Sequence, residues 1–412
     1  MKNKNRLFFV IIMIFPFITI SAKNTKYNSY KGLIMAGYQG WFNAPDDGAG
    51  RGWYHYSGPK GRFEPGCCTI DMWPDVREYK KVYKTKFVFD DSTPAYTFSS
   101  HDPSTVDTHF RWMKEYGLSG VFMQRFVNEV KGKSGKMHFN KVLASAVSSA
   151  RKYDRAICIM YDLSGMKKAD VDFVLSDLDE LDSTYKFKKR KKVPTYLFHN
   201  KKPLVAVWGV GFPGRSYDVE DVAKLVEGIQ KRGYSVMLGT PARWLPKEGK
   251  KPSADQLKLL DLIKKCDIVM PWFVGWYNDK VYLNMQPIIA EHLDWCNKNG
   301  VDYAPLAFPG FSWKNMYDMY GPNTTQIPRN KGDFFWTQLS GAISMGAEML
   351  YIAMFDEIDE GTAIFKCATR VPESFVPIEE GLQSDHYLWL VGEAGKMLRK
   401  EIPLSISQPV RK

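Results

Sequence analysis

The sequence predicts an α/β protein folded as a single (β/α)8 TIM barrel with an elaborated first βα loop. Short apolar runs, typical of buried parallel strands, alternate along the chain with longer stretches of helical period. No glycine-rich phosphate-binding turn follows the first run, although a doubly wound nucleotide-binding sheet would require one. We expect eight strands, at 33–41, 121–126, 156–161, 204–208, 235–239, 267–272, 303–308 and 349–355.

The stretches between these runs begin and end as helices do. Asp102 and Pro103 open one of them, with proline at the favoured first turn. Others stop at a glycine, such as Gly233 or Gly300, which the left-handed end of a helix favours. We expect helices from 102 onward and at about 140–153, 169–181, 219–232, 254–265, 281–299, 333–346 and 384–400.

The segment 42–100 separates the first expected strand from the first expected helix. It is long for a βα connection, and we expect it to contain a small hairpin around Phe87 and Tyr96. No linker or change of composition divides the rest of the chain. The whole segment 23–412 is therefore predicted to be one domain.

Residues 1–22 have the pattern of a secretory signal peptide. A basic start precedes the apolar run 7–20, which only Pro16 and Thr19 interrupt, and Ser21 and Ala22 follow before the polar segment 23–25. The run is short for a membrane span. We expect export to the periplasm or the medium, with no integral membrane segment left after cleavage. An uncleaved anchor is the alternative.

The formal net charge of +12 would ordinarily suggest a nucleic-acid partner. Much of the excess lies in the segment 186–192, which is typical of a solvated loop, so we expect no nucleic-acid partner. Cys158, Cys266 and Cys367 lie in or beside apolar runs, and no Cys and His spacing is typical of zinc. We therefore expect no metal and no cofactor, and a monomer.

Active sites of such barrels lie where the strands end, and most of the expected strands end in polar or aromatic residues. Several tryptophans facing one opening would suit the flat faces of sugar rings, although each one alone is equally typical of core packing. The substrate-binding candidates at these strand ends are Tyr38, Trp41, Arg125, Tyr161, Asp162, Trp208 and Trp272.

Four carboxylates follow the last expected strand within five residues: Asp356, Glu357, Asp359 and Glu360. One interpretation makes Glu357 and Glu360 the acid and base of glycosidic bond hydrolysis, with Asp356 beside them in the substrate site. The other makes the cluster a solvated acidic loop, and the spacing alone does not choose between them. His55 and Arg329 are further candidates for contacts with a sugar, or for structural roles.

Three segments carry a family resemblance. They are 37–42 with the following Trp53 and His55, the segment 99–109, and 355–362, which is similar to the pattern Phe-Asn-Glu-Trp-His-Glu-Gly-Thr. The chain resembles family 99 glycoside hydrolases, the endo-α-mannosidase and endo-α-mannanase group, within the wider family 71/99-like set. Arg329 also matches an arginine of that family, and the order and spacing agree across nearly the whole segment 23–412.

The resemblance implies retaining, endo-acting cleavage of α-linked mannose-type glycans without a metal. It implies that Glu357 takes the proton of the sugar 2-hydroxyl, which attacks its own anomeric carbon to give a 1,2-anhydro intermediate. It further implies that Glu360 protonates the leaving oxygen and later activates water. This chemistry needs a 2-hydroxyl trans to the leaving group, as α-mannosides have.

The chain departs from the family pattern around this pair. Asp356, Ile358 and Asp359 replace Asn, Trp and His, and Arg125 stands where an aromatic residue is expected. Asp162 takes the place of a third-strand Glu. Two alternatives therefore stay open: a related hydrolase of another linkage, such as a xylan or arabinan side chain, and a catalytically silent barrel that binds glycans.

Overall fold

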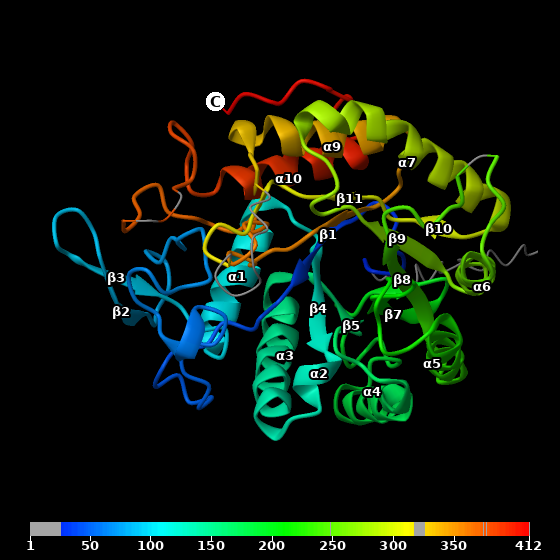
Figure 1. The fold of residues 1–412 in the computed structure, drawn as a ribbon, viewed down its shortest axis with the longest axis horizontal. Coiled ribbons are helices and arrows are strands. Elements are labelled where there is room, and N and C mark those ends of the chain that lie inside the picture. The colour runs from blue at the N-terminus through cyan, green and yellow to red at the C-terminus, as the bar shows by residue number, and fades with distance from the viewer. Residues whose placement is uncertain (1–25, 248, 317–325, 374, 376, 412) are drawn as a thin grey trace, which may run out of the picture.

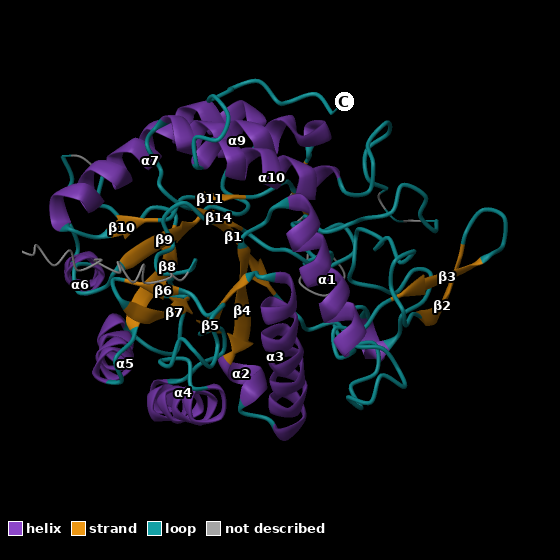
Figure 2. Cartoon of the chain, turned by 180° about the vertical axis from the view of Figure 1, so that it is seen from behind, coloured by secondary structure: helices purple, strands orange, loops and turns teal. Residues whose placement is uncertain are grey.

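The computed structural model describes residues 26–247, 249–316, 326–373, 375 and 377–411. The expected signal peptide lies outside the described residues. Figures 1 and 2 show one curled sheet surrounded by helices, with a loop-rich extension on one side formed by the segment between the first strand and the first helix. This arrangement is a (β/α)8 barrel, as the alternation of apolar runs predicts.

The barrel wall is a parallel sheet in which each strand pairs with the next one along the chain, and the last strand pairs with the first. All eight expected strands are present. In order around the barrel they are β1 (Ile34–Tyr38), β4 (Gly120–Phe126), β5 (Ala156–Asp162), β7 (Lys202–Trp208), β8 (Ser235–Pro241), β9 (Ile268–Trp272), β10 (Asp302–Tyr303) with β11 (Leu306–Ala307), and β14 (Leu350–Ile352).

The seventh strand closes the barrel in two pieces. Its first piece, β10, pairs with β9, and its second piece, β11, pairs with β14. Pro305 lies between the pieces and has no N–H to give to a ladder. Its carbonyl still accepts from the Tyr351 N–H at 3.0 Å, while the Ala304 N–H donates to Val269 at 3.0 Å. The predicted closed barrel is thereby confirmed, with an interruption that the sequence did not predict.

The first and last strands are shorter than the apolar runs that predict them. Beyond β1 and β14, the chain leaves the sheet toward one end of the barrel, although the Phe355 N–H still donates to the Gly37 carbonyl at 2.7 Å. The two segments approach so closely at Gly37 that a Cβ atom there would stand 2.6 Å from the Ala353 carbonyl oxygen. Glycine is therefore required at this position for steric reasons.

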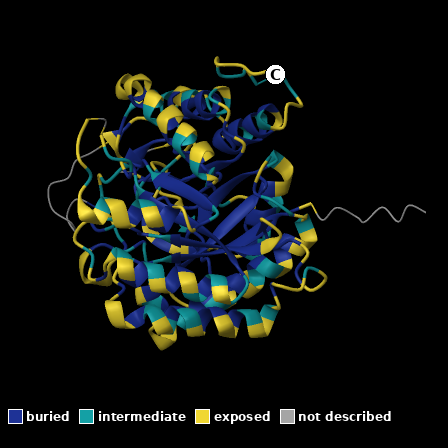
Figure 3. Ribbon diagram, turned by 90° about the vertical axis from the view of Figure 1, so that its right-hand side faces the viewer, coloured by how far each residue is buried: buried dark blue, intermediate teal, exposed yellow. Residues whose placement is uncertain are grey.

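All eight expected helices are present, and they lie on the outside of the barrel with buried inner and exposed outer faces (Figure 3). None of the described helices combines the length and apolar character that a membrane span needs. The helices are α1 (Pro103–Tyr116), α3 (Lys133–Tyr153), α4 (Val171–Tyr185), α5 (Val219–Lys231), α6 (Ala254–Ile263), α7 (Asp279–Asn299), α9 (Asp333–Ser344) and α10 (His386–Leu398), with the short α2 (Val127–Val130) after β4.

The predicted hairpin in the first loop is formed by β2 (Tyr83–Val88) and β3 (Pro94–Thr97), which pair antiparallel. A second antiparallel pair, β12 (Phe311–Ser312) with β13 (Gln326–Ile327), follows the seventh strand. A two-residue strand, β6 (Phe198–His199), lies against β7. Short 3-10 turns complete the described elements, at Pro59–Gly61, Lys168–Asp170 and Asn330–Gly332. All six cysteines are free thiols, and Cys158 is fully buried in β5.

Candidate active site

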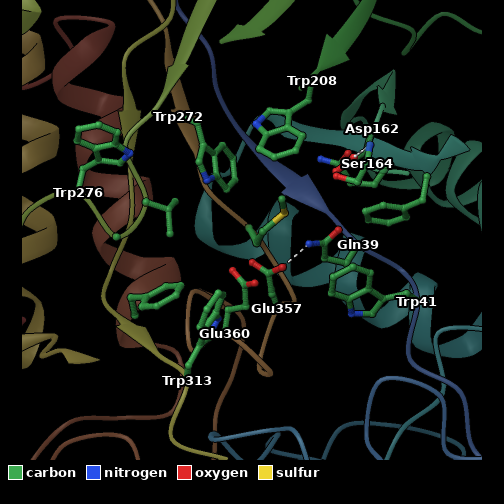
Figure 4. A pocket seen from close by; sticks show the side chains of 16 residues that line it. Gln39, Trp41, Asp162, Ser164, Trp208, Trp272, Trp276, Trp313, Glu357 and Glu360 are labelled. Carbon is green, nitrogen blue, oxygen red and sulfur yellow. Dashed lines mark hydrogen bonds between the residues drawn. The ribbon is translucent and has the colours of Figure 1, made fainter. Parts of the chain in front are cut away.

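A cavity of about 660 Å³ opens at the carboxyl ends of the strands. Its volume lies within the range of roughly 300–1,000 Å³ that is usual for ligand sites. Figure 4 shows that side chains from several strands and loops converge on it. The residues lining it are Gln39, Trp41, Gln124, Phe126, Asp162, Ser164, Trp208, Trp272, Val274, Gly275, Trp276, Phe311, Trp313, Met354, Glu357 and Glu360.

The loop after β14 brings the two glutamates to this cavity because backbone hydrogen bonds fold it back tightly. The N–H groups of Thr362 and Ala363 donate to the Glu357 carbonyl at 3.1 and 3.0 Å. The Asp356 carboxylate accepts the backbone N–H groups of Gln39 at 2.8 Å and Gly40 at 2.9 Å. Asp356 therefore ties the loop to the end of β1 and does not line the cavity, where the sequence analysis placed it.

Glu357 is held at both oxygens of its carboxylate. The side-chain amide of Gln39 donates to Oε1, and the Thr362 hydroxyl donates to Oε2 at 2.5 Å. Burial, together with the nearby carboxyls of Glu360 and Asp359, raises the pKa of Glu357 well above its ordinary value. The two hydrogen bonds oppose this shift because they favour the ionised form.

Glu360 lines the same cavity and is partly exposed. Its backbone carbonyl accepts the Ser312 N–H at 2.9 Å, which fixes the end of the loop against β12. Burial of the carboxyl and the neighbouring Asp359 raise the pKa of Glu360 from 4.5 to about 8. This shift favours the protonated form of the side chain, which a general acid needs.

Asp359 lies behind the pair, where it hydrogen-bonds the His55 ring between Oδ2 and Nδ1 at 3.1 Å. Burial raises the pKa of Asp359 to about 8 and lowers that of His55 to about 3. The neutral His55 ring stacks on Trp41, with ring centroids 3.7 Å apart and planes 5° apart. His55 is not among the cavity-lining residues, and it acts on the site by fixing Trp41, which lines it.

Asp162, the last residue of β5, lies across the cavity from the glutamates, and its carboxylate accepts the Ser164 backbone N–H at 2.7 Å (Figure 4). Burial raises the pKa of this carboxyl. Trp208 and Trp272 form the adjoining wall, packed edge to face with ring centroids 5.4 Å apart. Asp162, Trp208 and Trp272 therefore lie where the sequence analysis expects them.

Three of the residues predicted to bind substrate lie away from the cavity. Tyr38 is fully buried, and its hydroxyl bonds His109 Nδ1 at 2.8 Å. Arg125 pairs with Asp177 through Nε at 2.6 Å and Nη2 at 2.5 Å, and the Tyr161 hydroxyl donates to the same carboxylate at 2.8 Å.

The reason for these displacements is the alternation of side chains along a strand. Tyr161 and Asp162 are neighbours, so when Asp162 faces the cavity, Tyr161 faces the surrounding helices. The same holds for Arg125 beside Gln124. At the end of β1, Gln39 faces the cavity and Tyr38 does not. Because of this alternation, Gln39 and Gln124 line the cavity in place of the predicted Tyr38 and Arg125.

Arg329 also stays outside this cavity. Its Nη2 donates to the carbonyls of Gly361 at 2.9 Å and Ala363 at 2.6 Å, and its guanidinium lies 4.5 Å from the centre of the Tyr387 ring. It thus supports the loop that carries the glutamates from the opposite side, where it lines a second cavity of about 340 Å³.

The sequence analysis did not assign five of the prominent lining side chains: Gln39, Gln124, Phe126, Trp276 and Trp313. For Gln39 and Gln124, the alternation of side chains along a strand shows only that either each glutamine or its assigned neighbour, Tyr38 or Arg125, faces the cavity. Trp276 and Trp313 lie in loops after β9 and β12, where no periodicity applies. Among the described residues, no group of three or more His, Cys, Asp or Glu is placed to hold a metal ion.

No protein-family model matches the sequence. Among solved structures, a family 99 endo-α-mannosidase from Bacteroides thetaiotaomicron is similar, with 16% identity and a TM-score of 0.64 over 90% of this chain and 98% of that one. A glycoside hydrolase-like protein matches with 12% identity and a TM-score of 0.54 over 76% and 89% of the two chains. The expected structural resemblance to family 99 is thereby confirmed at the level of the fold.

Proposed function

We propose that this protein is an exported, retaining glycoside hydrolase that cleaves α-linked, mannose-type glycans within the chain. One observation carries the proposal: Glu357 and Glu360 line one cavity together with five tryptophans. Paired carboxyls supply acid and base for glycosidic bond cleavage, and indole faces suit sugar rings. The tryptophans are Trp41, Trp208, Trp272, Trp276 and Trp313.

Burial raises the pKa of both glutamates, so the division of roles between them rests on the resemblance to family 99. Burial and Asp359 raise the pKa of Glu360 to about 8, which suits the acid that protonates the leaving oxygen. Glu357 accepts hydrogen bonds at both oxygens, which partly offset the rise in its pKa that burial and Glu360 cause. Glu357 would then act as the base toward the 2-hydroxyl, as the resemblance to family 99 implies.

The choice of an α-mannoside rests on the same resemblance. A 1,2-anhydro intermediate requires the 2-hydroxyl to lie trans to the leaving group, and α-mannosides meet this condition. Glu357 and Glu360 both match the family pattern, although Asp356 and Asp359 replace Asn and His beside them. The mannose preference is therefore the part of the proposal that a glycan screen tests first.

Export is part of the proposal because residues 1–22 have the pattern of a signal peptide. We expect the mature protein to begin at Lys23 and to act as a monomer in the periplasm or outside the cell. Sequencing the N-terminus of the protein recovered from fractionated cells checks the site of cleavage. A chain that stays in the cytoplasm with Met1 intact would contradict export.

The proposal is tested with Glu357→Gln and Glu360→Gln, which keep side-chain size and remove the acid. Parent and variants are incubated with a panel of α-mannans, xylans and arabinans, and the products are analysed. Each variant should lose at least about a hundredfold in rate, the usual contribution of a general acid or base. Glu115→Gln, on the outer surface of α1, is the matched control. Parent-like rates for both site variants would refute the proposal.

A second candidate is a barrel that binds glycans without cleaving them. The changed residues beside the pair favour it, because Asp359 stands where the family pattern has His and adds a buried acid behind Glu360. The same panel separates the candidates. Tight binding of a glycan with no product, in parent and variants alike, would support capture over hydrolysis.

A further inference from the structure

Trp276 stands at the rim of the cavity with 49% of its surface exposed. It belongs to the loop between β9 and α7, and the other four tryptophans of the cavity are more buried. A large aromatic ring left in water forgoes the favourable free energy of burial, so core packing does not explain its position. In Figure 4 it lies on the far side of the cavity from Trp41, with Glu357 and Glu360 between them.

Other aromatic and apolar side chains line the cavity together with Trp276. Figure 4 shows Trp272 beside Trp276 and Trp313 beside Glu360, and Val274 and Phe311 also line the cavity. Trp208 continues the aromatic surface on the other side of Trp272, edge to face at 5.4 Å. Such a surface offers stacking positions for more sugar units than the one whose bond is cleaved.

The charge of the lining restricts the chain that this surface accepts. Asp162, Glu357 and Glu360 contribute carboxyl groups, and no Lys, Arg or His is among the described residues that line the cavity. Burial raises the pKa of all three carboxyls, so the lining favours their uncharged forms, and a sugar carrying its own carboxylate or sulfate would lose hydration in a half-buried site whose lining holds no cation. Arg215 is the basic residue beside this lining, where its Nη1 donates to the Ser164 hydroxyl at 3.3 Å and its guanidinium lies 5.6 Å from the centre of the Trp208 ring.

We propose that the cavity binds an extended, uncharged glycan chain and that Trp276 is the platform for a sugar unit beyond the cleaved bond. This inference rests on the proposed function, since it names the class of substrate that the glutamate pair acts on. The outer platform makes the protein selective for chain length. A substrate too short to reach Trp276 would bind through the inner tryptophans alone.

The test compares parent, Trp276→Ala and Trp276→Phe on a series of α-linked manno-oligosaccharides of increasing length, or on the glycan that the parent is found to cleave. For chains long enough to reach the rim, kcat/KM of Trp276→Ala should fall about tenfold, roughly the effect of losing one stacked face. The shortest substrate should be cleaved at the parent rate, and Trp276→Phe should recover part of the loss. Leu283→Ala, an exposed apolar residue on α7, is the control.

Equal losses on short and long substrates, or no loss on either, would overturn the inference while leaving the proposed function standing. If the parent cleaves nothing, the proposed function fails. The role of Trp276 is then tested by measuring the binding of glycan chains alone. Long neutral chains should then quench tryptophan fluorescence of the parent more strongly than that of Trp276→Ala. Equal quenching would overturn the inference.

A separate binding experiment tests whether the substrate must be uncharged. The same neutral chain, with its primary hydroxyls oxidised to carboxylates, should bind at least about tenfold more weakly than the untreated chain at pH 7, because the lining offers no cation to pair with the added charges. Stronger binding of the oxidised chain would overturn the claim that the substrate is uncharged. The length series would be unaffected by that result, so the two claims fail separately.

Discussion

The side-chain amide of Gln39 donates a hydrogen bond to the carboxylate of Glu357 and so joins the end of the first strand to the loop after the last one. The two residues are 318 positions apart in the chain. Barrel closure through β11, β14 and β1 brings them together. The protonation of Glu357 therefore depends on a residue that its own loop does not contain.

Gln39→Met should slow catalysis and shift its pH dependence. The amide favours the ionised carboxylate, so removing it raises the pKa of Glu357 and moves the acidic limb of kcat/KM to higher pH. We expect a loss of about tenfold or more at pH 6, and a smaller loss at pH 8. Thr362→Val, which removes the other donor, should act in the same direction. A profile that superimposes on that of the parent would show that these donors do not tune Glu357.

Arg125→Met should destabilise the fold without changing substrate binding, since Arg125 faces the helices and pairs with the fully buried Asp177. Removing one partner leaves the other charge buried, which costs about 3–5 kcal/mol. Urea denaturation measures this loss, and KM of the folded variant should match that of the parent. Arg125→Met with Asp177→Asn should recover part of the stability. A raised KM with normal stability would instead place Arg125 in the substrate site.

Asp359→Asn should flatten the dependence of stability on pH. Burial raises the pKa of Asp359 from 3.8 to about 8 in the folded protein, so the folded state holds this proton more tightly than the unfolded chain does. The contribution of this proton to the free energy of unfolding is fully present below about pH 4. It is lost as the pH rises to about 8, by up to roughly 1.4 kcal/mol per pH unit. Urea midpoints at pH 5 and pH 9 should therefore differ less in the variant. An unchanged difference would contradict this assignment.

Arg329→Met should lower kcat more than it raises KM. Arg329 touches the loop carbonyls of Gly361 and Ala363 and does not line the main cavity, so its loss misplaces the glutamates rather than removing a contact with the sugar. Arg329→Lys should restore little, because one ammonium does not reproduce the planar guanidinium. Arg370→Met, on an exposed pair with Asp90, is the control. A pure KM effect would argue for direct substrate contact.

Strand positions were predictable because parallel strands buried on both faces read as apolar runs, and the helices between them carry their own end signals. The split of the seventh strand at Pro305 was not predicted. A proline interrupts a strand where its missing N–H would have faced a neighbouring strand, and the neighbours of this strand are known only from the tertiary structure. The hairpin around Phe87 and Tyr96 was predicted from local pattern alone, because a hairpin joins residues that are close in the chain.

For the candidate site, the two glutamates and the ends of the strands were predicted from the sequence, but some side chains that were expected to face the cavity point away from it. Tyr38 and Arg125 were expected at the cavity, yet their neighbours Gln39 and Gln124 line it. Which of two adjacent side chains faces inward depends on how the strand is rotated against the barrel, and buried strands with apolar residues on both sides do not reveal that rotation. Trp276 was missed because loop positions have no period.

By itself, the sequence determined the order of the elements and showed four acids directly after the last strand, since both are read from local pattern. Only the tertiary structure decided which acids meet the cavity. Asp356 and Asp359 turn toward backbone and His55, while Glu357 and Glu360 face the tryptophans. That division depends on contacts between segments hundreds of residues apart, which form only when the barrel closes.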